Sequence, residues 1–387
     1  MDRHLLTLAL GMFAIGTDSF VVAGIIPLIA DSMHAPIPTA GQMVTLYALS
    51  YAVFSPVIAA LAAHWSRKGL LVGGMGVFIL GNMMTALAPT LSVLLGSRLI
   101  TGLGAAMFSP TATAVGASLV PPAQRGRALA IVIAGLTSAT ALGSPIGTFL
   151  GTLGDWRITL WFVTALGILA AIGVWLLLPS LPTSPAISLR QRLAPLTDSR
   201  VTLTLLTTLL AYGGFFTVYT YIGVSFDRAT LGNGDRLALL LLIWGCAATA
   251  GNLVAGKLTD RLGSRRIING ALLLTIIDFT LLPWSSGSLA SAIPALIVWA
   301  FCGWGLLVPQ QHRLLAIFPA LGALLMGLNS AAIYLGVSAS GILGGLGIQF
   351  ADAHHLGWIS AVLIALAFLC AEGAHRLMAR SEGTAPR

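Results

Sequence analysis

Long apolar runs alternate with short polar segments along all 387 residues of the chain. Each run is close to the ~20 residues that an α-helix needs to cross the hydrocarbon core of a bilayer. Separated at charged residues and at proline and glycine clusters, twelve runs lie near 5–29, 41–63, 70–88, 91–118, 127–150, 158–178, 202–225, 236–258, 267–284, 290–312, 320–347 and 356–377. The pattern predicts an all-α membrane protein with twelve spans.

The segment between the sixth and seventh runs divides the spans into two sets of six. It is rich in proline and arginine, with Pro179, Pro182, Pro185, Pro195, Arg190, Arg192 and Arg200. We expect an N-terminal six-helix bundle at 1–180, a linker at 181–200 and a C-terminal bundle at 201–387. Similar loops after the second and eighth runs favour a parallel internal repeat, which places a binding site between the two halves.

Composition excludes a soluble globular enzyme. Hydrophobic residues make up 57% of the chain and charged residues only 8%, against about 25% charged in ordinary soluble domains. The sequence also shows no nucleophile and base pair or metal cluster at reactive spacing, so we expect no catalytic residue, metal or cofactor. Cys246, Cys302 and Cys370 have no CxxC spacing and are interpreted as small buried apolar residues, while His354 and His355 are expected to be solvated.

The net charge of +8 is distributed unevenly between the two ends of the spans. If the N-terminus is cytoplasmic, sixteen Lys and Arg residues lie on that side, three on the other, and Arg98 inside a span. The positive-inside rule then predicts a multi-pass membrane protein with both termini cytoplasmic. Because the basic residues are scattered over short loops, we expect lipid around the protein and no nucleic-acid partner.

The loop after the eighth run has a distinctive order of residues: Gly256, Leu258, Asp260, Arg261, Gly263, Arg265 and Arg266. This order resembles the loop motif G-x-L-x-D-R-x-G-R-[RK] of the major facilitator superfamily, with the last basic pair displaced by one. The loop after the second run is degraded, because it keeps Arg67 and Lys68 but has Ala63 and His64 where the motif has Asp and Arg. The resemblance implies a gate in which Asp260 pairs with arginines. The alternative is a loop that only orients the protein.

Two further spans resemble the twelve-helix drug:proton antiporter branch of this superfamily, which includes sugar and multidrug efflux proteins. The fourth span starts a motif at Arg98, R-x-x-T-G-x-G-A-A, where the family has glutamine in place of Thr101. The fifth span has Gly143, Pro145 and Gly147, similar to the antiporter motif G-P-x-x-G with the proline shifted by one. Glycines at steps of four make a smooth helix face, so close helix packing is the simpler alternative.

Asp18 is the strongest candidate for a proton-binding residue. It lies thirteen residues into the first run, ~20 Å along the helix, where a carboxylate must be protonated or paired. The resemblance places its helix in one cavity with the helix of Arg98, so we expect Asp18 to carry the coupling proton and Arg98 to tune it. An Asp that only hydrogen-bonds within the bundle is the alternative. Asp278, deep in the ninth run, is expected to have a structural or interfacial role.

Polar and aromatic residues on spans that line the cavity by resemblance are weaker candidates for solute contacts. They are Gln42, Tyr47, Tyr212, Phe216, Tyr219, Asn252, Gln310 and Asn329. Individually, such residues are more often interface anchors or interhelical hydrogen bonds.

The resemblance implies a monomeric secondary transporter of the bacterial inner membrane that exports small amphipathic solutes, such as a drug, a sugar or a related metabolite, by proton antiport with alternating access. Two other functions stay open. One is proton-coupled or facilitated uptake of a sugar or nucleoside, and the other is a membrane sensor that transports nothing.

Overall fold

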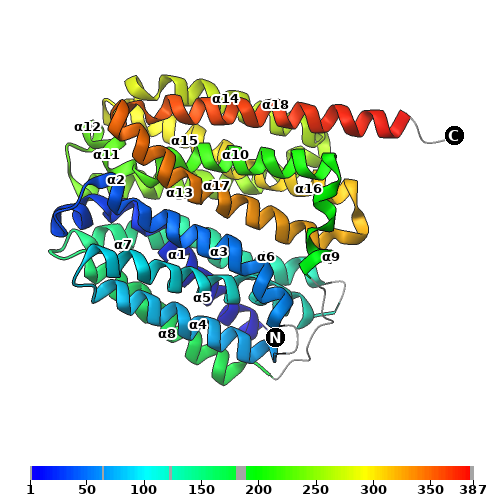
Figure 1. Ribbon diagram of the computed structural model, residues 1–387, viewed down its shortest axis with the longest axis horizontal. Helices are drawn as coiled ribbons and strands as arrows, with labels where there is room; N and C mark the ends of the chain where they lie inside the picture. Colours follow the sequence, from blue (N-terminus) through cyan, green and yellow to red (C-terminus); the bar gives the residue numbers. More distant parts are fainter. Residues whose placement is uncertain (1, 63–64, 122–123, 180–188, 384–387) are drawn as a thin grey trace.

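The computed structural model describes residues 2–62, 65–121, 124–179 and 189–383. Within these ranges the chain is helical, without β-strands, and twelve segments are long and apolar enough to cross a membrane (Figure 1). The twelve-span all-α fold predicted from the sequence is confirmed.

Eight α-helices and one π-helical turn form the first six spans. They are α1 (Asp2–Ser32), α2 (Ile37–Ala40) with α3 (Gln42–Leu61), α4 (Arg67–Ala86), α5 (Leu91–Ser118), α6 (Arg125–Ser138) with η3 (Ala139–Gly143) and α7 (Ser144–Gly151), and α8 (Arg157–Leu177). The fifth span is therefore composite: α6 and α7 are joined by the π-helical turn η3.

The last six spans follow a short connection made of α9 (Leu189–Leu193) and η4 (Ala194–Thr197). They are α10 (Ser199–Thr220), followed by the short α11 (Ile222–Ser225) and α12 (Asp227–Thr230), then α13 (Gly234–Leu262), α14 (Ser264–Ser285), α15 (Leu289–Gly305) with α16 (Leu307–Ile317), η5 (Pro319–Leu321) with α17 (Gly322–Phe350), and η6 (Ala353–His355) with α18 (Leu356–Gly383). Residues 181–188 of the expected linker lie outside the described residues.

Polar residues just before the helices fix several of the helix starts. The side chains of Ser66, Thr90 and Ser288 each accept a backbone N–H from the first turn of the following helix. Asp198 caps α10, and the hydrogen bond donated by the Arg200 side chain lowers the pKa of this carboxyl. Such caps satisfy backbone N–H groups that have no partner within the helix, which matters most near an apolar membrane core.

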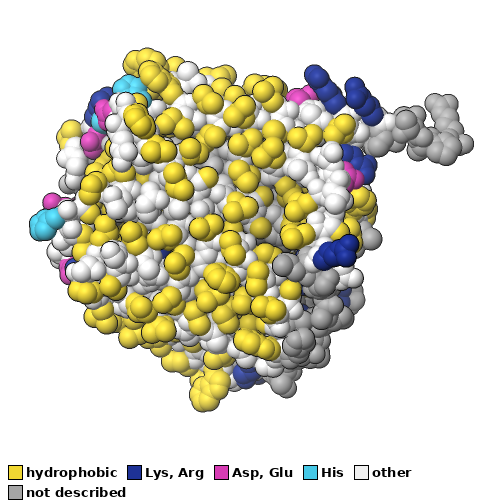
Figure 2. Space-filling model, in the orientation of Figure 1, with side chains coloured by type: hydrophobic (Ala, Val, Ile, Leu, Met, Phe, Trp, Pro, Cys, Tyr) yellow, Lys and Arg dark blue, Asp and Glu magenta, His cyan; other side chains and the backbone are white. Residues whose placement is uncertain are grey.

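Two faces of the bundle are distinguished by their loops. We call the face with the two chain ends and α9 the terminal face, and the face with α2, α12 and η6 the distal face (Figure 1). Figure 2 shows apolar side chains over the middle of the molecule, with charged side chains gathered at the two ends. This distribution is what a membrane-spanning bundle requires, because charges are costly within hydrocarbon.

The two sets of six spans contact each other in a reciprocal way. The second span packs on the eleventh, where Tyr51 of α3 and Tyr334 of α17 stack with ring centroids 3.7 Å apart. The fifth span packs on the eighth, where Gly245 of α13 lies against the backbone of Thr140 in η3. The eighth and eleventh spans are the second and fifth spans of the second set. A two-fold repeat that superimposes one set on the other therefore converts each of these contacts into the other.

The halves also meet toward the distal face. Gln42 Nε2 of α3 donates to the carbonyl oxygen of Gly341 in α17 at 3.2 Å. Tyr221, which follows α10, donates through its hydroxyl to the same carbonyl at 2.7 Å, and the side chain of Thr45 lies against Gly341. These contacts close the bundle between its middle and its distal face.

Candidate functional site

Asp18 of α1 and Arg98 of α5 form a two-pronged ion pair inside the first six spans. Arg98 Nη1 donates to Asp18 Oδ1 and Nη2 to Oδ2, both at 2.9 Å. Asp18 is 0% exposed and Arg98 is 1% exposed. A parallel fork of this kind is the strongest hydrogen-bonded arrangement available to an arginine and a carboxylate. The two residues singled out in the sequence are therefore brought together in the structure.

Tyr47 and Ser19 surround the ion pair. The guanidinium carbon of Arg98 lies 4.8 Å from the ring centroid of Tyr47, a cation–π geometry. Ser19 donates to the Tyr47 hydroxyl oxygen at 2.9 Å. Arg98 Nε is buried and has no hydrogen-bond partner among the described residues. The arginine is thus held by one carboxylate and one ring face, so its position depends on the charge of Asp18.

The fifth span packs its small residues against α1. A Cβ atom at Gly147 would lie 2.5 Å from Cγ2 of Val21, and one at Gly151 would lie 2.9 Å from Cγ2 of Ile25. Gly143 lies against Thr17 in the same way. The π-helical turn ends at Gly143, directly before Ser144 and Pro145, where proline removes a backbone donor. This motif therefore lies between α1, which carries Asp18, and α13 of the other half.

Tyr212, Phe216 and Tyr219 of α10 belong to an aromatic cluster that fills the centre of the last six spans. Tyr219 packs on Trp244 of α13 with ring centroids 4.6 Å apart. Phe20 of α1 enters this cluster from the other half and lies 5.9 Å from the Tyr219 ring. The Tyr219 hydroxyl also donates to the Phe20 carbonyl oxygen at 3.2 Å, so Tyr219 joins the two halves next to the ion pair.

Three other cavity candidates are used in hydrogen bonds between helices. Thr208 donates to Asn329 Oδ1 at 3.0 Å, and Gln310 Nε2 donates to Thr208 Oγ1 at 3.4 Å, which links α10, α16 and α17. Gln42 spans the two halves, as described above. Asn252 Oδ1 is buried without a partner among the described residues. Apart from Asn252, these side chains act as interhelical links in this conformation.

The residues of the expected gate are separated in the structure. Asp260, Arg261 and Arg266 are exposed, and Asp260 has no ion pair in the part of the chain that the structure describes. Arg265 instead forms a two-pronged pair with Glu372 of α18, through Nε to Oε1 at 3.0 Å and Nη2 to Oε2 at 2.6 Å. Asn269 donates to the same carboxylate at 2.6 Å.

Basic residues at the loops satisfy the carbonyl ends of helices. Lys68 donates to the carbonyl oxygen of Leu178, the residue that follows α8, at 2.6 Å, and Arg192 of α9 donates to the carbonyl oxygen of Ala59 near the end of α3 at 3.0 Å. Arg67 opens α4, and Ala63 and His64 lie outside the described residues. Cations at helix C-termini are favoured by the helix dipole.

Four residues outside the ion pair have surroundings that the sequence did not predict. Arg313, which directly follows the tenth apolar run of the sequence, is 2% exposed inside α16 and donates to the Ala371 carbonyl oxygen at 3.1 Å. His354 is not free in solvent, because it contacts Asp227 at 2.7 Å and Asp352 at 3.0 Å. Cys246 is exposed, not buried, since it sits on the outer surface of α13. Asp278 Oδ2 is buried without a partner among the described residues.

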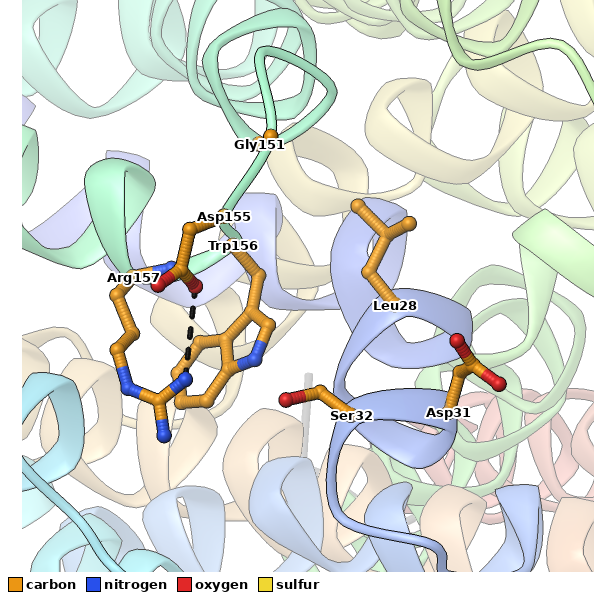
Figure 3. Close-up of a pocket in the computed structure, with 8 residues that line it drawn as sticks. Leu28, Asp31, Ser32, Gly151, Asp155, Trp156 and Arg157 are labelled. Carbon is orange, nitrogen blue, oxygen red and sulfur yellow. Dashed lines mark hydrogen bonds and ion pairs between the residues drawn. The ribbon is translucent and has the colours of Figure 1, made fainter.

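A pocket at the distal face lies within the first six spans, between α1 and the turn that joins α7 to α8. Figure 3 shows Leu28, Asp31 and Ser32 on one side and the ion pair of Asp155 with Arg157 on the other. None of the expected cavity residues lines it. This pocket is therefore separate from the buried pair of Asp18 and Arg98.

The aromatic residues around the site were not predicted from the sequence. Phe20, Tyr51, Trp244, Trp304 and Tyr334 all take part in ring contacts within or between the halves. The available signal was that Phe20 lies two residues after Asp18. Aromatic residues are common in membrane helices, so their type alone did not distinguish them.

Comparisons with known proteins relate the chain to membrane transporters. Residues 8–319 match the family described as the Major Facilitator Superfamily. The chain is 33% identical to the uncharacterized MFS-type transporter YtbD of Bacillus subtilis, over 98% of this chain and 96% of that protein. It is 31% identical to the inner membrane transport protein YdhP of Escherichia coli K12, over 89% and 88% of the two chains.

Two more matches are a resistance protein and a solved transporter structure. The chain is 32% identical to a chloramphenicol resistance protein of Streptomyces lividans over 96% of each chain. The solved structure of a bacterial homologue of the human lysosomal transporter Spinster, in an inward-facing and occupied conformation, has a TM-score of 0.78 over 96% of each chain. At 17% identity, this second likeness concerns the fold alone.

Proposed function

Since the chain belongs to the major facilitator superfamily, a family of transporters, we propose that it exports a small amphipathic solute in exchange for protons. The observation that carries this proposal is the buried pair of Asp18 and Arg98. Burying a carboxylate at this depth in a membrane span is energetically costly, and such residues usually have a function. The charge of Asp18 would determine whether its ion pair with Arg98 forms.

The pair suggests how a proton could couple to movement. Protonation of Asp18 removes the negative charge that holds both terminal nitrogens of Arg98, and loss of the proton restores it. A released Arg98 would keep the Tyr47 ring as its neighbour. Proton and solute would then compete for one state of the site, which is the requirement for exchange.

Export is favoured over uptake by two features. One is the glycine and proline pattern of the fifth span, which resembles antiporters. The other is the relative named as a chloramphenicol resistance protein, because export of a drug is one way to give resistance to it. Proton-coupled or facilitated uptake of a sugar or nucleoside is the second candidate, and a membrane sensor without transport is the third.

Twelve spans make this a multi-pass membrane protein, and an inner membrane transport protein is among its relatives. We further propose that the terminal face is cytoplasmic, because most Lys and Arg residues belong to its loops. The halves would be residues 1–180 and 201–387, working as one monomer in lipid. Asp260 would close the cytoplasmic side by pairing with arginines in another conformation, since it is exposed here.

Transport by everted membrane vesicles tests the proposal. Their interior corresponds to the outside of the cell, so an exporter accumulates its solute when the interior is acidified. The panel contains chloramphenicol, ethidium, a pentose sugar and a nucleoside, each with and without a protonophore. We expect accumulation of at least one solute that the protonophore abolishes, compared with vesicles lacking the protein. Accumulation only in right-side-out vesicles would instead indicate uptake, and none in either would favour the sensor.

A further inference from the structure

Phe20 of α1 fills an aromatic box that belongs entirely to the other half of the molecule. We define the box by four side chains of the last six spans: Phe216, Tyr219, Trp244 and Trp304. Their ring centroids lie 6.2, 5.9, 6.3 and 5.9 Å from that of Phe20, respectively. These separations fall within the range that aromatic rings prefer. The box therefore binds one aromatic ring already, supplied by the protein itself.

The walls of the box are held in place from behind. Trp299 packs against Trp244 at 5.8 Å and against Phe279 at 5.3 Å, so a second layer of rings supports the first. Trp299 is 1% exposed and Trp244 is 3% exposed. All of these residues lie on spans seven to ten, so the walls and their support belong to one half of the molecule. Phe20 lies on the first span, in the other half.

Two hydrogen-bond donors in this region are buried without partners. Trp244 Nε1 and the Tyr212 hydroxyl have no partner among the described residues, although Tyr212 stacks on Phe216 of the box. A buried donor without an acceptor costs about 1–3 kcal/mol. The four box residues carry no formal charge, so the contacts that they offer are ring faces. The site offers these ring faces together with donors that lack acceptors.

We infer that the box is the solute site, and that its ligand is an aromatic molecule with hydrogen-bond acceptors that takes the place of Phe20. This inference rests on the proposed transport function and adds the class of solute. When the halves rock apart, α1 leaves α10, α13 and α15, and the box opens. An aromatic ring of the solute then replaces the Phe20 ring, and its acceptors satisfy the indole or phenol donor. Since Phe20 is two residues from Asp18, the solute and the ion pair act on the same helix.

Calorimetric binding to the purified full-length protein in lipid nanodiscs tests the inference. The probes are 1-naphthamide, its fully saturated decahydro counterpart and 1-methylnaphthalene, each corrected with empty nanodiscs. Phe20→Ala empties the box, and Phe13→Ala removes the same side chain two turns earlier on α1 as a matched control. Trp244→Phe keeps a ring but removes the indole donor. Near-ultraviolet circular dichroism checks that each variant is folded.

We expect 1-naphthamide to bind at least roughly tenfold more tightly than either other probe, because it alone offers both the ring and the acceptor. Phe20→Ala should tighten its binding by roughly threefold or more by removing the competing ring, and Trp244→Phe should weaken it by roughly fivefold. Equal binding of the aromatic and saturated probes, or equal effects of Phe20→Ala and Phe13→Ala, would overturn the inference.

Binding and export distinguish the two proposals. Selective binding of 1-naphthamide with no solute accumulation in vesicles would refute the transport function but keep the aromatic site. Proton-driven export of a pentose by a protein that ignores 1-naphthamide would refute the aromatic site alone.

Discussion

Asp18 and Arg98 are each costly in the apolar interior, and their pairing makes both tolerable. Removing one partner of a buried ion pair costs about 3–5 kcal/mol, because the other charge is left alone. Under the proposed function, a proton on Asp18 would remove the charge that holds Arg98, and Arg98 would keep its contact with the Tyr47 ring. The pair would then be a site where gaining one proton changes the position of a cation.

The sequence alone identified both members of this pair. Charged residues inside apolar runs are rare, so Asp18 and Arg98 stand out without any structure. Phe20 and Trp244 could not be found in the same way, because apolar and aromatic residues occupy every span. Which of them meet is decided by the packing of the two halves, which no local pattern records.

Asp18→Asn should abolish the proton release that a transported solute induces in the purified protein, because asparagine cannot exchange a proton. Release is measured with a pH-sensitive dye in weak buffer. Solute binding should persist, although Arg98 left without its partner will lower stability. The double variant Asp18→Asn with Arg98→Gln removes both charges and should recover part of that stability.

Asp278→Asn provides the control for this measurement. Asp278 is the other deep carboxylate, and it lies in α14, away from the pair. The control should release protons as the wild type does. Normal proton release from the Asp18→Asn variant, together with loss of proton release from the Asp278→Asn variant, would identify Asp278 in α14 as the proton-carrying residue.

Between elements, the fifth span packs on α1 through residues that recur every four positions on both helices. Gly143, Gly147 and Gly151 of the fifth span face Thr17, Val21 and Ile25 of α1. The glycine spacing predicted a smooth face, but the partner helix came only from the structure. The π-helical turn before Ser144 was also beyond prediction, because the shifted proline permits either a kink or a change of helical pitch.

Gly147→Ala should destabilise the protein by about 1–3 kcal/mol, the usual cost of overpacking. The added methyl would meet Val21 Cγ2 at 2.5 Å and Thr159 Cγ2 at 3.2 Å, and both residues are β-branched and stiff. The measurement is the midpoint of thermal unfolding in detergent at a fixed scan rate.

Gly76→Ala is the matched control, because a Cβ there has no atom within 4 Å. It should leave the midpoint unchanged or slightly raised, since alanine favours helix over glycine. Equal losses in both variants would show that the α1–α7 contact can relax around a methyl group.

For the whole molecule, span number followed directly from the lengths of the apolar runs. Helix ends were less predictable, because they depend on capping residues. The apolar run predicted a start near residue 202, but α10 begins at Ser199 because Asp198 caps the helix there. The pairing of the second span with the eleventh and the fifth with the eighth is a property of the repeat. It could be anticipated only through the resemblance to a known family.

Cysteine labelling of intact cells tests the orientation of the bundle. Ser264→Cys, at the start of α14, should resist an impermeant thiol reagent, and Asn233→Cys, before α13, should react, because the proposed orientation places the basic loops in the cytoplasm. The exposed Cys246 is first replaced by serine to remove background labelling. Strong labelling at position 264 with none at 233 would invert the topology.

The ion pair also has a consequence for membrane voltage. Asp18 and Arg98 together carry no net charge, so the buried site becomes positive only when a proton binds. Moving one elementary charge across the membrane is worth about 2.3 kcal/mol per 100 mV. If one proton enters for each uncharged solute that leaves, the exchange draws on the electrical potential as well as on the pH difference. If the solute is a monovalent cation, the two charges cancel and only the pH difference drives it. Valinomycin and potassium, which remove the membrane potential, should therefore slow export of an uncharged solute in the vesicle assay and leave export of a cation unchanged. Export of an uncharged solute that is insensitive to valinomycin would argue against a net movement of charge.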